Sequence, residues 1–223
     1  MTAAKRAAAF AAADLVPDGA TIGLGSGSTF AYVVERLAER MQGGLKVRGT
    51  PTSRATAELA QSAGIPLVSL DDVERLDLAI DGADEVDPHK NLIKGGGGAH
   101  VRERIVADAA KELIVVVDDS KLVDVLGKAF LLPVEVLPFG WRHTARRIEA
   151  TGCTAARREA GGEPFVTDNG NWIVDCKYDG IHDPALLDAQ LGGLTGVVGH
   201  GLFVGMAGRV VVADAAGKVR VLP

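Results

Sequence analysis

Two neighbouring segments of the chain place acids, a lysine and glycines in an order that suits chemistry on a small polar molecule. The segment DGADEVD (81–87) carries four acidic residues, and LIKGGGG (92–98) follows with a lysine and four glycines. Carboxylates such as Asp81 and Asp84 bind hydroxyl groups or move protons, and Lys94 beside exposed backbone N–H groups suits a developing negative charge. The ordinary alternatives are a solvated acidic loop and a flexible glycine-rich loop tip.

A third segment, GLGSGSTF (23–30), has the composition of an anion-binding turn between a strand and a helix. Small residues there let backbone N–H groups and the helix N-terminus approach a phosphate, and Ser26, Ser28 and Thr29 add hydroxyl groups. A dinucleotide fingerprint needs a third glycine where Ser28 stands, and an acid after the second strand, which this chain lacks. The pattern favours a small phosphate over a nucleotide, and a plain strand–helix turn is the remaining alternative.

Two further charged residues, Glu103 and Lys121, could belong to the same site. In the helical pattern after the glycines, Val101, Ile105 and Ala109 have the spacing of a buried stripe, and Glu103 lies about 200° from Val101 around the helix. We expect Glu103 to lie outside the core, in a cleft or in solvent. Lys121, in DDSK (118–121), is a candidate for binding an anionic group or an ordinary exposed lysine.

The sequence predicts no metal centre and no disulfide framework. The acidic segment does not have the spacing of a calcium-binding loop, and the five histidines are scattered. The two cysteines, Cys153 and Cys176, lie far apart without a CxxC pair, which is typical of a reducing cytosol.

The first half of the chain alternates helical and strand patterns. Its continuous apolar strands predict an α/β fold with a Rossmann-like, doubly wound, mostly parallel sheet. Ligands bind at the carboxyl edge of such sheets, so we expect the four polar segments to ring one cleft there. The expected helices cover 2–14, 29–41, 53–64 and 101–112, and the expected strands cover 20–24, 45–50, 65–70, 76–81 and 113–119.

The second half has a different order of elements. Residues 132–204 read strand, helix, two strands, helix and strand, with a turn at 168–171, which predicts a smaller ferredoxin-like α+β domain. The tail predicts a hairpin that returns to the first sheet. The expected domains are a Rossmann-like catalytic domain of 1–130 plus 205–223 and an α+β domain of 131–204, the latter placed at an oligomer interface.

Composition excludes several classes of protein. The net charge of −5 and an aromatic content of 4% argue against a nucleic-acid-binding protein. No apolar run has the roughly 18–20 residues of a membrane-spanning helix. The alanine-rich N-terminus predicts an ordinary first helix rather than a signal peptide, because Asp14 interrupts it.

The chain resembles the A-type ribose-5-phosphate isomerase family in motifs that run nearly from end to end. The combination of DGADEVD with KGGGGAxxRE is far more specific than a glycine-rich loop alone. The matching segments are GLGSGST (23–29), DGADEVD (81–87), LIKGGGGA (92–99), RERIVA (102–107), VVDDSK (116–121), LPVEVLPF (132–139), FVTDNGNWIVD (165–175) and GVVGHGLF (196–203).

The resemblance implies an aldose–ketose isomerase of the pentose phosphate pathway that interconverts D-ribose 5-phosphate and D-ribulose 5-phosphate through a cis-enediolate. It implies Glu103 as general base, with Asp81, Asp84 and Lys94 as further catalytic residues, and no metal or organic cofactor. It also implies a cytoplasmic homodimer or homotetramer. The substrate-binding residues that it implies are Ser26, Gly27, Ser28, Thr29, Asp81, Gly82, Ala83, Asp84, Lys94, Gly95, Gly96, Gly97, Lys121 and Lys5.

Three positions depart from the family pattern without removing a chemical group that the mechanism needs. Ser26 replaces a commoner threonine, Arg104 a lysine, and His100 a larger apolar residue. We hypothesise that His100 is a titrating neighbour of Glu103. Two alternative functions remain at this point: a non-catalytic phosphosugar-sensing module, which would need a DNA-binding partner domain, and a nicotinamide-dependent oxidoreductase.

Overall fold

The computed structural model describes residues 2–223, and their contacts group them into two units. Unit 1 holds the chain up to Ala83, Arg102–Lys121 and Met206–Pro223, and unit 2 holds Asp84–Val101 and Leu122–Gly205. Contact grouping assigns 84–101 and 122–130 to unit 2, whereas the sequence-based division put them in the first domain. The domain limits of 1–130 plus 205–223 and 131–204 stay a prediction.

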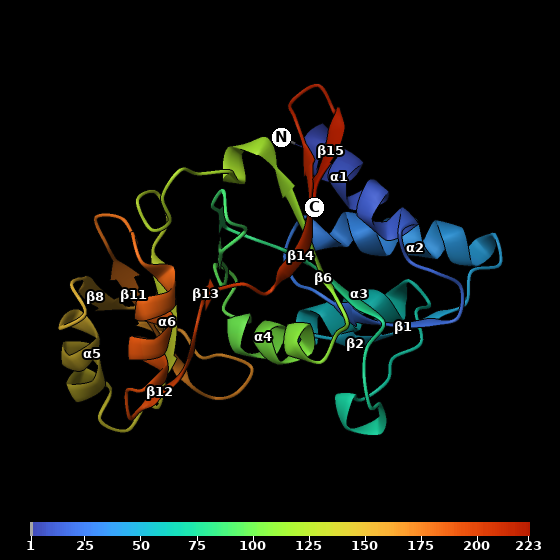
Figure 1. Cartoon of the computed structure of the whole chain (residues 1–223). Coiled ribbons are helices and arrows are strands. Elements are labelled where there is room, and N and C mark those ends of the chain that lie inside the picture. Colours follow the sequence, from blue (N-terminus) through green and yellow to red (C-terminus); the bar gives the residue numbers. More distant parts are fainter. Residues whose placement is uncertain (1) are drawn as a thin grey trace. The chain divides into compact units, whose positions relative to one another are not determined.

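Unit 1 is built on a six-stranded sheet with the order β15-β14-β6-β3-β1-β2. All neighbouring strands run parallel except β15, which pairs antiparallel with β14 (Figure 1). This confirms the mostly parallel sheet and the tail hairpin that returns to it. The strands are β1 (Ala20–Leu24), β2 (Val47–Pro51), β3 (Leu78–Gly82), β6 (Leu113–Asp118), β14 (Ala207–Ala213) and β15 (Val219–Leu222).

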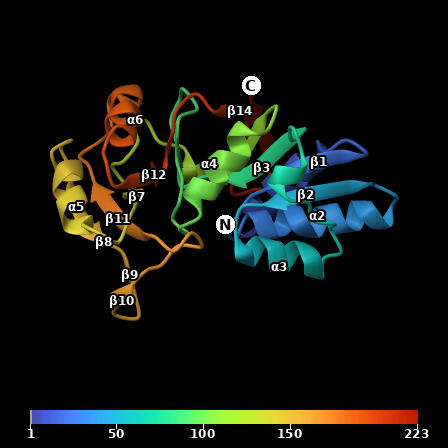
Figure 2. The same ribbon diagram turned by 90° about the horizontal axis from the view of Figure 1, so that it is seen from below.

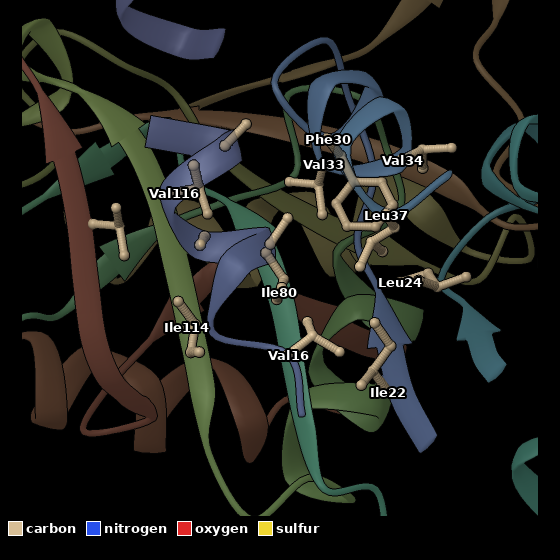
Figure 3. Packing of buried hydrophobic residues seen from close by; sticks show 14 of the residues in the cluster. Val16, Ile22, Leu24, Phe30, Val33, Val34, Leu37, Ile80, Ile114 and Val116 are labelled. Atoms are coloured by element: carbon tan, nitrogen blue, oxygen red, sulfur yellow. The ribbon is translucent and has the colours of Figure 1, made fainter. Parts of the chain in front are cut away.

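Helices cover both faces of this sheet. On one face α1 (Thr2–Asp14) and α2 (Phe30–Gln42) pack against the apolar side chains of β1, β3, β6 and β14, as Figure 3 shows for Phe30, Leu37 and Ile80. On the other face α4 (His100–Asp108) brings Val106 against Gly23, where a Cβ atom would lie 2.4 Å from its Cγ1. A further helix, α3 (Arg54–Ser62), follows β2, and its Ala60 is buried in the same apolar cluster as Ile22 and Phe30.

The buried stripe of α4 differs from the predicted one. Ile105 is 53% exposed, whereas His100, Glu103, Val106 and Ala107 are buried. The prediction was wrong because it assumed that only apolar residues form the stripe. Two polar residues take buried positions on this helix, so apolar periodicity alone selected a face that is rotated away from the true one.

Unit 2 contains a four-stranded antiparallel sheet with the order β12-β7-β11-β8 (Figure 2). Two helices pack on one face of it, through residues that include Ile148 and Leu191. The elements follow the expected strand–helix–strand–strand–helix–strand order, which confirms the smaller α+β part. They are β7 (Leu132–Val136), α5 (Trp141–Glu149), β8 (Thr154–Arg157), β11 (Trp172–Lys177), α6 (Pro184–Gly192) and β12 (Val197–His200).

Short elements complete the chain, and two expected strands are reduced. The strand expected at 65–70 shrinks to a bridge between Gly49 and Leu67, and the strand expected before the 168–171 turn shrinks to a bridge between Val166 and Trp172. The sheet partner of β11 is β8 instead. The remaining elements are β4 (Glu85–Val86), β5 (Leu92–Ile93), β9 (Glu159–Ala160), β10 (Glu163–Pro164), β13 (Leu202–Phe203) and 3₁₀ turns at Leu70–Asp72 and Asp119–Lys121. Within residues 2–223 no helix is long and apolar enough to cross a membrane.

Candidate active site

The loop between β1 and α2 has the geometry of an anion-binding turn. Gly27 has a φ of 95°, a left-handed conformation that favours glycine, and it turns the chain into the helix. The positive end of the α2 dipole favours an anion beside this turn, while the N–H groups of Phe30 and Tyr32 donate to the carbonyls of Gly27 and Thr29. Gly27 and Ser28 are exposed, and the Thr29 hydroxyl does not cap the helix. These backbone and hydroxyl groups suit a phosphate.

Ser26 differs from its neighbours because three other hydroxyl groups lie within hydrogen-bonding distance of its Oγ. Its Oγ lies 2.8 Å from Thr52 Oγ1, 2.9 Å from Ser53 Oγ and 3.0 Å from Thr56 Oγ1. Ser53 is also the N-cap of α3 and accepts from the Thr56 N–H. This hydroxyl cluster therefore fixes the loop to the start of α3, so Ser26 shapes the loop. Sequence reasoning missed the cluster, although a serine before a helical pattern is itself an N-cap signal.

Asp81 lies at the end of β3 and is 4% exposed. Its Oδ1 accepts hydrogen bonds from the backbone N–H of Ser26 at 3.1 Å and of Gly82 at 2.7 Å. A Cβ atom at Gly25 would lie 2.3 Å from this oxygen. The first turn after β1 must therefore be bare backbone to admit the carboxylate, which holds an orientation set by two N–H donors. Ala83 follows directly and is partly buried.

Two lysines of unit 1 were predicted to meet the phosphate. The Nζ of Lys5, on α1, donates to Ser28 Oγ at 3.3 Å, so a positive charge stands beside the turn. Lys121 ends a 3₁₀ turn that follows β6. Since β6, β3 and β1 are neighbouring parallel strands, Lys121 leaves the sheet at the same edge as Asp81 and the loop after β1.

Glu103 lies in the first turn of α4 and is 7% exposed. Of the two positions expected for it, in a cleft or in solvent, this burial excludes the solvated one. A glutamate is almost never this buried unless it is paired or has a function. His100 begins the same helix at 0% exposure, against Gly95.

In unit 2 the acidic segment divides into one site candidate and two structural acids. Asp84 accepts a 2.8 Å hydrogen bond from the Gly96 N–H, which links it to the glycine segment. Glu85 accepts from the N–H groups of Gly127, Ala129 and Phe130. Asp87 accepts from the N–H groups of His89 and Asn91 and from the Asn91 side chain. Both acids therefore stabilise turns.

Lys94 holds its charge in a buried position, at 3% exposure, with Nζ 5.5 Å from the centre of the Phe203 ring. An aromatic face is a favourable partner for a desolvated cation. The backbone N–H of Lys94 donates to the Gly201 carbonyl, which anchors the start of the glycine segment. Gly96 and Gly97 beyond it are exposed, whereas Gly95 and Gly98 are buried.

The predicted residues thus form two groups, one in each unit. Unit 1 brings together the loop 26–29, Lys5 and Asp81–Gly82, and it carries Glu103 and Lys121. Unit 2 brings Asp84 to Gly96 and places Lys94 at the start of the same segment. In the described part of the chain, no group of three or more His, Cys, Asp or Glu side chains has the arrangement to hold a metal ion.

Comparison with known proteins identifies the family of this chain. A family model described as ribose 5-phosphate isomerase A (phosphoriboisomerase A) matches residues 48–217. This chain belongs to the ribose 5-phosphate isomerase A family. The resemblance expected from the motifs is thereby confirmed.

Similarity to individual members of the ribose 5-phosphate isomerase A family extends over nearly the whole chain. A ribose-5-phosphate isomerase A from Synechococcus sp. (strain JA-3-3Ab) is 53% identical over 96% of this chain and 94% of its own. The solved ribose 5-phosphate isomerase from Plasmodium falciparum is 40% identical with a TM-score of 0.96, covering 100% of this chain and 98% of that one. A D-ribose-5-phosphate isomerase solved in complex with phospho-erythronic acid is 38% identical with a TM-score of 0.94, covering 98% and 96%.

Proposed function

We propose that this chain interconverts D-ribose 5-phosphate and D-ribulose 5-phosphate in the non-oxidative branch of the pentose phosphate pathway, with Glu103 as the general base. The observation that carries the residue assignment is the burial of Glu103 in the first turn of α4, directly after the segment of Lys94 and the glycines. Full-length membership of the family supports the reaction itself.

Isomerisation moves one proton between two neighbouring carbons of the open-chain sugar. The Glu103 carboxylate removes the proton from C2, and the electron pair of that bond moves toward the C1 carbonyl to give a cis-enediolate. The protonated Glu103 then returns the proton to C1, the hydroxyl proton on O2 passes to O1, and the C2 carbonyl forms. One carboxylate on one face of the sugar is sufficient for both transfers, and such general acid–base catalysis typically contributes about 10²–10⁴-fold to the rate.

The enediolate puts negative charge on oxygen, and Lys94 and the N–H groups of Gly95 and Gly97 are the groups we assign to stabilise it, while the Gly96 N–H holds Asp84. Burial strengthens the electrostatic effect of Lys94, because less water screens its charge. Asp81, with Gly82 and Ala83 beside it, and Asp84 bind sugar hydroxyls and pass protons when the ring opens.

The phosphate supplies binding energy remote from the reacting carbons. We assign it to the turn of Ser26, Gly27, Ser28 and Thr29, to Lys5 and to Lys121. The hydrogen bond from Lys5 to Ser28 supports this assignment, because it brings a cation to the exposed part of the turn.

The same proposal includes a cytoplasmic enzyme that needs no metal or organic cofactor and forms a homodimer or homotetramer. Exposed apolar side chains in unit 2 support self-association, since Phe139 is 94% exposed, with Leu137 at 48% and Leu186 at 55%. Light scattering should give at least twice the chain mass of 23.1 kDa. A particle of a single chain mass would remove the oligomer from the proposal.

The direct test is ketose formation from ribose 5-phosphate with EDTA present and no added cofactor. We expect steady turnover, with ribose lacking the phosphate as a poor substrate. Binding of ribose 5-phosphate without turnover would instead indicate the non-catalytic phosphosugar-sensing module. Family membership at this identity and coverage favours the isomerase over that alternative.

A further inference from the structure

We infer that Arg158, held in place by Asp175, is a positioning residue that sets the direction of the N–H groups in the glycine segment 95–97. This rests on the proposal that the segment binds the enediolate. All the residues concerned belong to unit 2.

The guanidinium of Arg158 contacts the glycine segment directly. Its Nη1 donates to the carbonyl oxygen of Gly95 at 3.1 Å and to that of Gly96 at 3.0 Å. A trans peptide points its C=O and N–H in opposite directions, and the structure has no cis peptide bond in residues 2–223. Holding these two carbonyls therefore turns the N–H groups of Gly96 and Gly97 away from Arg158.

One of these N–H groups binds an assigned catalytic acid, and the other belongs to an exposed glycine. The N–H of Gly96 donates to Asp84, one of the assigned catalytic acids, at 2.8 Å. The N–H of Gly97 belongs to the exposed part of the segment. Without the bonds to Arg158, glycine peptides are free to rotate, because no side chain restricts them. A donor that has already been oriented stabilises charge without a reorganisation step during the reaction.

Arg158 is itself fixed from three sides. Its Nε and Nη2 make a bidentate pair with Asp175, at 2.9 and 2.5 Å, and both side chains are only 16% exposed. Its backbone N–H donates to Ile173, and its carbonyl accepts from Phe165. A guanidinium can grip a carboxylate with one edge and still donate from the other nitrogen, which an ammonium group cannot reproduce.

The same two neighbours also fix the far end of the segment. A Cβ atom at Gly98 would lie 2.5 Å from Phe165 Cε1 and 3.3 Å from Ile173 Cδ1. The Arg158 guanidinium lies 5.7 Å from the centre of the Phe165 ring. One arginine, one aromatic ring and one strand residue thus clamp the segment from Gly95 to Gly98.

The test compares Arg158→Ala, Arg158→Lys and Asp175→Asn with Arg157→Ala. Arg157 is the adjacent arginine, its guanidinium lies 5.1 Å from the ring centres of both Trp141 and Trp172, and its Nη2 donates to Glu159. We expect the Arg158 variants to lose about 10- to 100-fold in kcat while KM for ribose 5-phosphate changes less than about threefold. Arg157→Ala keeps its kcat.

Two readouts separate positioning from simple loss of structure. Millimolar guanidinium should restore part of the kcat of Arg158→Ala and none of any loss in Arg157→Ala. Inhibition by phospho-erythronic acid, whose carboxylate carries charge on oxygen, should weaken in the Arg158 variants more than substrate binding does. If Arg158→Ala does not fold, Arg158→Lys decides the matter through its kcat and its inhibition constant.

A Lys94→Gln variant measured beside them identifies which proposal fails. Loss of kcat in Lys94→Gln with full kcat in every Arg158 variant overturns the positioning role alone. Full kcat in Lys94→Gln overturns the assignment of the segment to the enediolate, and the positioning role with it. Equal loss in Arg157→Ala and Arg158→Ala, without guanidinium rescue, reduces Arg158 to a structural residue and also overturns the inference.

Discussion

The Oδ1 atom of Asp81 accepts a hydrogen bond from the backbone N–H of Ser26, which joins the end of β3 to the turn after β1. The contact is close because Gly25 has no side chain, since a Cβ atom there would lie 2.3 Å from the carboxylate and 2.6 Å from the Ile80 carbonyl. The missing side chain at Gly25 therefore allows the Asp81 carboxylate to hold the turn that we assign to the phosphate.

We predict that Gly25→Ala displaces the Asp81 carboxylate and lowers kcat/KM by about 100-fold. Stability should fall as well, because the new methyl group meets backbone as well as a side chain. Steady-state kinetics and thermal unfolding measure the two effects. A variant with unchanged kcat/KM would show that the exact position of this carboxylate does not matter for turnover.

Replacing each serine of the turn with alanine should show that Ser26 supports the stability of the fold and Ser28 supports substrate binding. Ser26→Ala removes the centre of the hydroxyl cluster with Thr52, Ser53 and Thr56 and should cost about 1–3 kcal/mol of unfolding free energy. Ser28→Ala, at an exposed position, should change stability by less than about 0.5 kcal/mol and raise KM. Urea denaturation and substrate titration check both variants, and the reverse pattern would contradict the roles given to the two hydroxyls.

The corrected face of α4 gives a prediction about packing. Val106→Ala should destabilise the fold by about 2 kcal/mol, because Val106 is 5% exposed and fills the space over Gly23. Ile105→Ala, at 53% exposure, should cost less than about 0.5 kcal/mol. Chemical denaturation of the pair measures the difference. Equal losses of unfolding free energy in the two variants would contradict this and place Ile105 in the core, as apolar spacing alone predicts.

The cysteines of unit 2 should differ in reactivity with pH. A hydrogen bond from Cys176 lowers the pKa of Cys153 to about 7, against the opposing effect of its partial burial. The pKa of Cys176 is raised by that same bond and by its burial. Cys153 should therefore be mostly thiolate above pH 7, and its alkylation by iodoacetamide should rise with a midpoint near that pH, while Cys176 stays protected.

Mass spectrometry of the labelled peptides follows both thiols. In Cys176→Ala the lowering partner is gone, so the midpoint of Cys153 alkylation should move upward. An unchanged midpoint would mean that Cys176 is not the cause of the shift.

Most of the fold was predicted from the apolar patterns and the order of elements in the sequence. Continuous apolar strands alternating with helices predicted the parallel sheet of unit 1, and the element order of 132–204 predicted the antiparallel sheet of unit 2. The strand expected at 65–70 was reduced to one bridge at Leu67, because apolar content does not reveal whether a neighbouring strand is there to pair with. Partner choice is a tertiary property, so β8 was not identified as the strand beside β11.

The site was predicted in its residue types but not in its supporting contacts. The segments and the family resemblance together predicted Asp81, Asp84, Lys94 and Glu103 as site residues, and these roles stay predictions. The sequence did not show what Glu85 does, because its carboxylate binds three backbone N–H groups of a distant turn. Contacts such as that from Arg158 to Gly95 join residues far apart in the chain, and no local pattern encodes them.

The central claim is that Glu103 moves the proton, and Glu103→Gln tests it most directly. Glutamine keeps the size of the side chain but has no basic carboxylate. We predict that the variant folds with the wild-type melting temperature, binds phospho-erythronic acid as tightly as the wild type, and loses about 10²–10⁴-fold in kcat. A variant that binds the same ligand and turns over ribose 5-phosphate at nearly the wild-type rate would contradict the account.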